Sequence, residues 1–130
     1  MKKAQKIVIG FFVLTLIVIA TLYIIYLTKL SHKDIALEVK DNTLFYSLTC
    51  PHCKNVEAFI DENNITKKIN ITQLEVSQNK TNANQLIAIG EKCKIDSSLI
   101  GAIPLFYSNG FCYVGDTDII LMLNKTMSNK

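Results

Sequence analysis

The chain has 130 residues, with 14 basic and 11 acidic side chains and a formal net charge of +3. This length leaves room for one domain of about 100 residues once the N-terminal segment is set aside. The net charge comes wholly from Lys2, Lys3 and Lys6, since lysines and acidic residues balance from residue 29 onward. The composition of the folded part therefore gives no sign of a nucleic-acid-binding surface.

The N-terminal segment predicts a membrane anchor over residues 1–28. No residue from Ile7 to Leu27 is charged, and as a helix this run would be roughly 32 Å long, enough to cross a hydrocarbon core of about 30 Å. A cleaved signal peptide is the alternative, because Val18–Ala20 resembles a cleavage site. The apolar run continues beyond it, past the usual length of about 7–15 residues in a signal peptide. We therefore expect an uncleaved, single-pass anchor.

The lysines around this segment predict its orientation. Three precede it, whereas Lys29 and Lys33 follow it together with two acidic residues. The positive-inside rule then favours a cytoplasmic N-terminus and an extracytoplasmic domain. Because every basic residue is lysine and Ile and Asn are abundant, as in proteins from AT-rich genomes, a bacterial source is favoured.

Residues 29–40 predict a polar tether. The alternation of Ile35, Leu37 and Val39 leaves open a short edge strand within it. Residues 41–130 then predict one folded domain.

Strand and helix patterns alternate within this domain in the order β-α-β-α-β-β-α. The expected strands are 43–48, 68–76 (with a bulge), 103–108 and 111–115, and the expected helices are 51–64, 79–93 and 116–127. Pro51 suits the first turn of a helix, where its missing N–H is not needed. The first two strands should be parallel, and Asn109-Gly110 predicts a hairpin between the last two.

Cys50, Pro51, His52 and Cys53 stand where the first strand meets the first helix. Two cysteines at this spacing can close and reopen a small disulfide ring, and the context favours a redox site. At the helix N-terminus, free N–H groups and the dipole favour a Cys50 thiolate. His52 can add a positive charge or a hydrogen bond near that sulfur. Cys53 should face the core and be less accessible.

A zinc half-site completed by Cys93, Cys112 or His52 is the alternative. Zinc ligands usually come from two knuckles, and Cys93 and Cys112 form no second one, so we expect neither a metal nor a cofactor. Three readings of Cys93 and Cys112 remain open: a structural disulfide, a relay pair that exchanges electrons with Cys50 and Cys53, or two buried free thiols.

The element order, with Cys-x-x-Cys opening the first helix and a proline opening the third strand, resembles the thioredoxin superfamily over roughly residues 41–127. Gly101–Pro104 looks like the cis-proline loop of that family, and Leu105–Gly110 looks like its hairpin. The Pro51-His52 pair is similar to that of the periplasmic disulfide-forming oxidases of the DsbA type. Small membrane-anchored thioredoxin-like proteins are a further group of kin.

The resemblance implies an α/β fold with a four-stranded mixed sheet and flanking helices. It implies that the Ile103 backbone, before a cis Pro104, pairs with a client strand, and that Thr49 belongs to the same substrate-binding site. Two positions depart from the family. Thr49 replaces the usual aromatic residue before the first cysteine, and Leu44 replaces a buried carboxylate. Glu57 is the nearest substitute carboxylate in sequence, with nothing further to support it.

The expected function is a membrane-anchored extracytoplasmic thiol–disulfide oxidoreductase that exchanges disulfides with protein thiols through Cys50 and Cys53. The Pro-His pair favours the oxidising direction, in which a membrane redox partner would restore the disulfide. A reductase supplied from the cytoplasm is the alternative direction. A non-catalytic accessory module that holds an exported peptide or a membrane partner is the alternative class.

Overall fold

The computed structural model describes residues 2–37 and 39–128. Met1, Glu38, Asn129 and Lys130, which fall in the predicted anchor, tether and folded domain, lie outside the described residues. The chain divides into two compact units, Met1–His32 and Lys33–Lys130.

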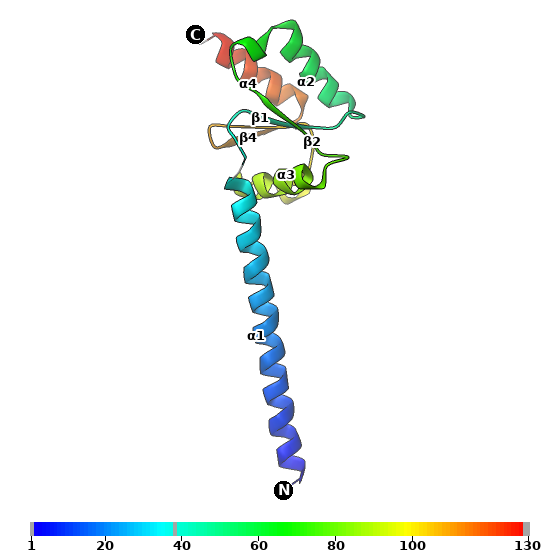
Figure 1. Cartoon of the computed structure of the whole chain (residues 1–130), viewed down its shortest axis with the longest axis vertical. Helices are drawn as coiled ribbons and strands as arrows, with labels where there is room; N and C mark the ends of the chain where they lie inside the picture. Colours follow the sequence, from blue (N-terminus) through cyan, green and yellow to red (C-terminus); the bar gives the residue numbers. More distant parts are fainter. Residues whose placement is uncertain (1, 38, 129–130) are drawn as a thin grey trace. The chain divides into compact units, whose positions relative to one another are not determined.

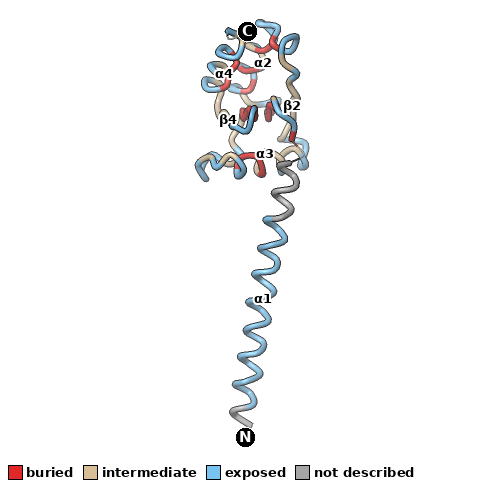
Figure 2. Tube along the Cα trace, turned by 90° about the vertical axis from the view of Figure 1, so that its left-hand side faces the viewer, coloured by how far each residue is buried: buried red, intermediate tan, exposed pale blue. Residues whose placement is uncertain are grey.

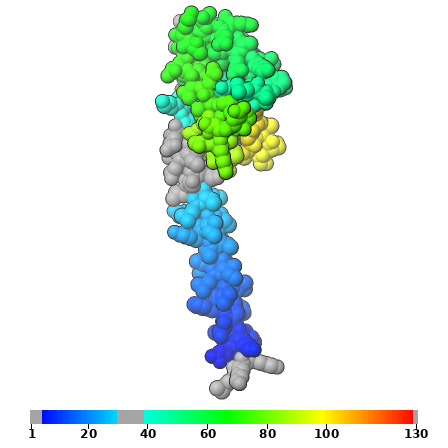
Figure 3. Space-filling model, turned by 45° about the vertical axis from the view of Figure 1, so that its right-hand side comes forward, coloured from blue at the N-terminus to red at the C-terminus, as the bar shows by residue number. Residues whose placement is uncertain are grey.

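The N-terminal helix α1 (Lys2–Leu37) contains a segment, Gln5–Lys29, that is long and apolar enough to cross a membrane. The side chains of this segment are exposed along its whole length (blue in Figure 3). Its threonine hydroxyl groups donate hydrogen bonds to backbone carbonyls of the same helix, as Thr15 Oγ1 does to the Phe12 carbonyl at 2.8 Å. The segment therefore needs no outside partner for these groups in an apolar environment. A signal sequence would meet the same criteria of length and composition.

The helix continues through Leu37, so the edge strand considered at Ile35, Leu37 and Val39 does not form. No glycine or proline interrupts residues 29–37. A helix that is already nucleated propagates through such a stretch at little cost, because each added residue gains a hydrogen bond.

Within the described residues, four strands form one mixed sheet in the order β2-β1-β3-β4. They are β1 (Thr43–Tyr46), β2 (Thr72–Glu75), β3 (Leu105–Ser108) and β4 (Phe111–Val114). β1 is parallel to β2 and antiparallel to β3, and β3 is antiparallel to β4. The predicted mixed sheet is confirmed.

Helices cover both faces of this sheet (Figure 1). α2 (Pro51–Glu62) and α4 (Asp116–Ser128) lie over one face, and α3 (Lys80–Lys92) lies over the other. Short 3-10 turns, η1 (Ile65–Lys67) and η2 (Ser97–Leu99), precede β2 and β3. The molecule's folded part therefore has three layers, which we call the α2/α4 layer, the sheet and the α3 layer.

The central strands are buried on both faces. Leu44 and Phe106 pack into the α2/α4 layer, whereas Phe45 and Leu105 pack into the α3 layer. All four side chains are at most 1% exposed, and Figure 2 shows the buried residues in the strands and on the helices beside them. Such burial holds the ends of β1 and β3 in fixed positions relative to each other.

The second strand is shorter than the predicted 68–76, because backbone N–H groups just before it form hydrogen bonds with η1 and not with the sheet. The N–H groups of Lys68 and Ile69 donate to the Ile65 carbonyl at 2.8 and 2.9 Å. Pairing with the sheet begins only at Thr72, whose N–H donates to the Asn42 carbonyl at 2.9 Å. Ile69 instead packs its side chain into the α2/α4 layer.

A disulfide joins Cys93, at the C-terminal end of α3, to Cys112 in β4, with 5.9 Å between the two Cα atoms. Both cysteines pack against the core of the α3 layer. The bond excludes the reading as two free thiols, whereas a structural disulfide and a relay pair both contain it. The bond ties the end of α3 to an edge strand of the sheet.

We expect the double variant Cys93→Ala/Cys112→Ala to lose about 3 kcal/mol in the free energy of unfolding. A cross-link across a loop of roughly 20 residues restricts the unfolded chain by that amount. Denaturant titration of the full chain in detergent, followed by circular dichroism, measures the loss. Wild-type protein treated with a strong reductant is the control and should approach the variant. Equal unfolding midpoints for the variant and the oxidised wild type would contradict the stabilising role.

Candidate functional site

Cys50 lies at the N-terminus of α2, at the end of the loop that leaves β1. Its backbone is extended (φ −85°, ψ 116°), and Pro51 occupies the first helical position. The N–H of Cys53 donates to Cys50 Sγ at 3.4 Å. The sulfur thus takes the place of the side-chain oxygen that usually caps a helix. Negative charge on this sulfur would face the positive end of the helix dipole.

Cys53, one turn into α2, is a fully buried free cysteine. Burial, followed by the hydrogen bond with Cys50, raises the pKa of its thiol to about 12, and the negative charge of Glu57 adds to the increase. A backbone hydrogen bond with Ser47 acts in the opposite direction. A thiol with this pKa stays protonated at neutral pH and is a poor nucleophile until it loses the proton. The pair is therefore asymmetric, with a half-buried Cys50 and a buried, protonated Cys53.

The loop before β3 borders the cysteine pair. The peptide bond between Ile103 and Pro104 is cis, and Pro104 is fully buried. The Ile103 carbonyl lies 4.0 Å from Cys50 Sγ, although 53 residues separate them in sequence. Within the described residues, no backbone carbonyl accepts the N–H of Ile103. An extended partner chain can therefore pair with this residue by strand addition.

Exposed side chains of small or apolar character flank the pair. Thr49 is exposed and shares a hydrogen bond of 3.2 Å with the Ser47 hydroxyl. Leu48, two residues before Cys50, is 56% exposed, and Leu99, elsewhere in the turn η2, is 45% exposed. Leucines this exposed in a folded unit offer contact area to an apolar segment of a partner.

His52 makes its hydrogen bond to α4. His52 Nδ1 lies 3.0 Å from Asp116 Oδ2, and Asn55 Nδ2 donates to the same oxygen at 2.7 Å. The hydrogen bonds from Asn55 and then His52 lower the pKa of Asp116 to about 2. In the described part of the chain, no hydrogen bond links His52 to Cys50. The imidazole is thus held by a carboxylate from another helix.

The structure brings most of the predicted site residues together. Cys50, Pro51, His52 and Cys53 form the first turn of α2, Thr49 precedes it, and the Ile103–Pro104 loop adjoins Cys50. The Cys93–Cys112 disulfide does not join this group, because it packs in the α3 layer. Direct exchange between the two cysteine pairs would require sulfur atoms on opposite sides of the sheet to meet.

The position where thioredoxins bury a carboxylate is apolar here. Leu44 is 0% exposed and packs in the α2/α4 layer. Glu57, the substitute that sequence suggests, is half-buried and acts on Cys53 only by raising the pKa of that thiol. Burial is the main reason why Cys53 keeps its proton, and Glu57 adds only the smallest contribution.

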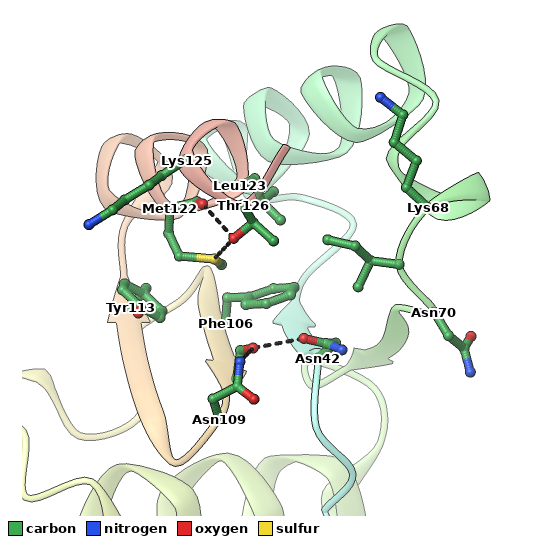
Figure 4. A pocket seen from close by; sticks show the side chains of 12 residues that line it. Asn42, Lys68, Asn70, Phe106, Asn109, Tyr113, Met122, Leu123, Lys125 and Thr126 are labelled. Atoms are coloured by element: carbon green, nitrogen blue, oxygen red, sulfur yellow. Dashed lines mark hydrogen bonds between the residues drawn. The ribbon is translucent and has the colours of Figure 1, made fainter. Parts of the chain in front are cut away.

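A cavity of about 560 Å³ lies elsewhere in the folded unit, next to Asn42 and Phe106. Asn42 precedes β1, whereas Cys50 follows it, so the cavity and the cysteine pair lie at opposite ends of that strand. Figure 4 shows Lys68 and Lys125 extending away from Phe106. No cysteine lines the cavity, and it is separate from the candidate redox site.

Comparison with known proteins finds no family model, no curated protein and no solved structure that matches the chain. Within residues 2–37 and 39–128, no group of three or more His, Cys, Asp or Glu side chains is arranged to hold a metal ion.

The contact between His52 and Asp116 was missed by sequence reasoning. The sequence pattern placed Asp116 only at the start of the expected last helix, 116–127. The two residues are 64 positions apart, and no local signal connects them. An acidic residue at the start of a helix becomes informative only once α4 is known to lie beside α2.

We expect iodoacetamide at pH 8 to modify Cys50 at least about a hundredfold faster than Cys53, because Cys53 is buried and its thiolate is scarce. Peptide mapping by mass spectrometry over time measures both rates. In a Cys50→Ser variant, the rate at Cys53 should rise about tenfold per pH unit between pH 7 and 9, since a raised pKa leaves the thiol mostly protonated throughout this range. Comparable rates at both cysteines, or a flat pH profile for Cys53, would contradict the asymmetry.

Proposed function

We propose that this chain is a membrane-anchored thiol–disulfide oxidoreductase of the thioredoxin-like class, which exchanges disulfides with protein thiols through Cys50 and Cys53. The observation that carries the proposal is the setting of the Cys50 sulfur. It caps α2, is half-buried, and lies 4.0 Å from the Ile103 carbonyl, next to a cis Pro104. The N-terminus of a helix stabilises negative charge that develops on such a sulfur during exchange, and a partner chain can reach it.

The topology supports the same proposal. The strand order β2-β1-β3-β4, a Cys-x-x-Cys at the start of α2 and a cis proline directly before β3 occur together. This combination resembles the thioredoxin superfamily, in which the active-site cysteines and the cis-proline loop adjoin each other. Any one of these features is common, and their coincidence at one end of β1 gives the resemblance its weight.

In the oxidising direction, a client thiolate attacks Cys50 Sγ in the Cys50–Cys53 disulfide. The bond between the two cysteines breaks, a client–Cys50 disulfide forms, and Cys53 takes the electron pair and a proton. The high pKa of the Cys53 thiol keeps that proton bound. A second client thiolate then attacks the client sulfur of the mixed disulfide and forms the client disulfide. Cys50 leaves as a thiolate, which the helix N-terminus stabilises.

Each such cycle oxidises the client by two electrons and leaves the protein reduced. A membrane redox partner that carries a disulfide and is itself reoxidised by a quinone would restore the Cys50–Cys53 bond. The Pro-His pair between the cysteines favours this direction by the resemblance to DsbA-type oxidases. In the reverse direction, Cys50 would attack a client disulfide and Cys53 would resolve the mixed disulfide.

The N-terminal helix supports an anchored enzyme. Gln5–Lys29 meets the length and polarity requirements of a span, and the lysines before it favour a cytoplasmic N-terminus. The cysteine pair would then face an extracytoplasmic, oxidising compartment of a bacterial cell. The Cys93–Cys112 disulfide fits such a compartment, since structural disulfides persist there.

That disulfide also weakens the zinc alternative. Thiolates bind zinc, whereas sulfur atoms in a disulfide do not. Cys93 and Cys112 are bonded to each other, so they do not complete a four-cysteine set with Cys50 and Cys53.

We expect a Cys53→Ala variant of the full chain, expressed in a bacterial host, to accumulate mixed disulfides through Cys50, because the neighbouring thiol that normally leaves or resolves the bond is gone. Non-reducing gels followed by mass spectrometry detect and identify the trapped clients. The double variant Cys50→Ser/Cys53→Ala is the matched control and should trap none. Equal yields from the two variants, or no adducts from either, would favour the non-catalytic accessory module.

We expect alkaline phosphatase fused after residue 130 to be active in a bacterial host, since that reporter folds only outside the cytoplasm, where its disulfides form. A fluorescent protein that works only in the cytoplasm, fused at the same residue, is the complementary control. The opposite reporter pattern would place the cysteine pair in the cytoplasm and remove the support for an extracytoplasmic oxidase.

A further inference from the structure

The carboxylate of Asp116 is bound by three donors from two helices. His52 Nδ1 and Asn55 Nδ2, both in α2, lie 3.0 and 2.7 Å from Oδ2. The N–H of Thr117 donates to Oδ1 at 3.0 Å. The Asp116 side chain is only 21% exposed, whereas the His52 side chain is 69% exposed. A carboxylate that uses both oxygens in this way is a fixed feature of the site.

The charge of this group is constant under physiological conditions. Hydrogen bonds from Asn55 and His52 hold the pKa of Asp116 near about 2, so the carboxylate is ionised at any pH at which a cell grows. Its negative charge therefore acts on His52 whether or not the imidazole is protonated. A protonated imidazole and the carboxylate together are neutral, and a neutral imidazole leaves a net charge of −1.

We propose that Asp116 is a positioning residue that holds the His52 imidazole by Nδ1 and offsets its positive charge, and thereby makes the Cys50–Cys53 disulfide less oxidising than its Pro-His dipeptide alone would. This inference rests on the proposed function. Reduction of the disulfide leaves at Cys50 a sulfur that can carry negative charge at the N-terminus of α2. A nearby positive charge stabilises that product, and a nearby negative charge opposes it.

The reaction that reports this effect is exchange with glutathione. Two glutathione thiols reduce the Cys50–Cys53 disulfide, giving glutathione disulfide and the protein dithiol, with two electrons transferred. Replacing Asp116 by Asn keeps the shape of the side chain and an oxygen that can accept a hydrogen bond, but removes the charge. The reduced protein should become more stable relative to the disulfide form, so the variant should be the stronger oxidant.

The chain offers a matched control for the charge at the start of α4. Asp118 is the other acidic residue in the first turn of that helix. Asp118→Asn removes the same charge from the helix N-terminus. Within the described residues, no hydrogen bond joins Asp118 to α2, so this variant reports the effect of helix electrostatics without a change at His52.

The test equilibrates the full chain in detergent with glutathione buffers at pH 7 and counts free thiols by alkylation gel shift. We expect D116N to raise the equilibrium constant for oxidation of glutathione by about three- to tenfold, and D118N to change it less than about twofold. In an H52A background, no imidazole offsets the carboxylate, so D116N should raise the equilibrium constant by at least as much as it does with His52 present. Thermal unfolding shows whether each variant is folded. If D116N does not fold, D116S replaces it, because serine keeps a capping hydroxyl group and removes the charge.

An unchanged equilibrium constant in D116N, or an effect of D116N that disappears in the H52A background, overturns the inference. These outcomes differ from failure of the proposed function. If the proposed function fails, wild-type Cys50 and Cys53 will not exchange with glutathione and the Cys53→Ala variant will trap no client. The inference about Asp116 then fails together with the proposed function.

Discussion

The orientation of the Cys50 sulfur is the constraint on which the rest of the site depends. The sulfur receives the N–H of Cys53 and so closes the open end of α2. It follows β1, a strand whose side chains are buried by helices on both faces. Because β3 runs antiparallel beside β1, the residues just before β3 reach the same end of the sheet. The Ile103 carbonyl therefore meets the sulfur without any direct link in sequence.

The two cysteines differ because one caps the helix and the other lies inside it. Cys50 keeps contact with solvent, whereas Cys53 is sealed between α2 and the sheet. Leu44 supplies no proton acceptor beneath the pair, and Glu57 adds negative charge that raises the pKa of Cys53 further. Attack by Cys53 on a mixed disulfide is therefore the step that proton loss should limit at neutral pH.

The three-layer arrangement separates stabilisation from chemistry. The Cys93–Cys112 disulfide braces α3 against β4 on one side of the sheet. The reactive pair belongs to α2 on the other side, where α4 is the neighbouring helix and brings Asp116 to His52. In our proposals, the Pro-His dipeptide makes the Cys50–Cys53 disulfide more oxidising and the Asp116 carboxylate makes it less so. Under the proposed function, the oxidising strength of the site depends on this tertiary contact as well as on the dipeptide.

Local signals in the sequence were enough to predict the apolar N-terminal helix, the order of the strands and helices after it, and the place of Cys50 at the start of α2. Periodicity, Pro51 and the Asn109-Gly110 turn act over a few residues, so they can be read along the chain. The same signals failed where the backbone had alternatives. The alternation at residues 35–39 did not stop α1 from propagating, and η1 took the N–H groups expected to pair in β2.

Tertiary structure alone decided which distant groups meet. The bond between Cys93 and Cys112, which the sequence left open, depended on the end of α3 packing beside β4. The partnership of His52 with Asp116 depended on α2 and α4 sharing a layer. Contacts of this kind are set by which face of the sheet each helix covers, because burial of apolar side chains makes that choice and leaves the polar groups to pair with whatever lies beside them.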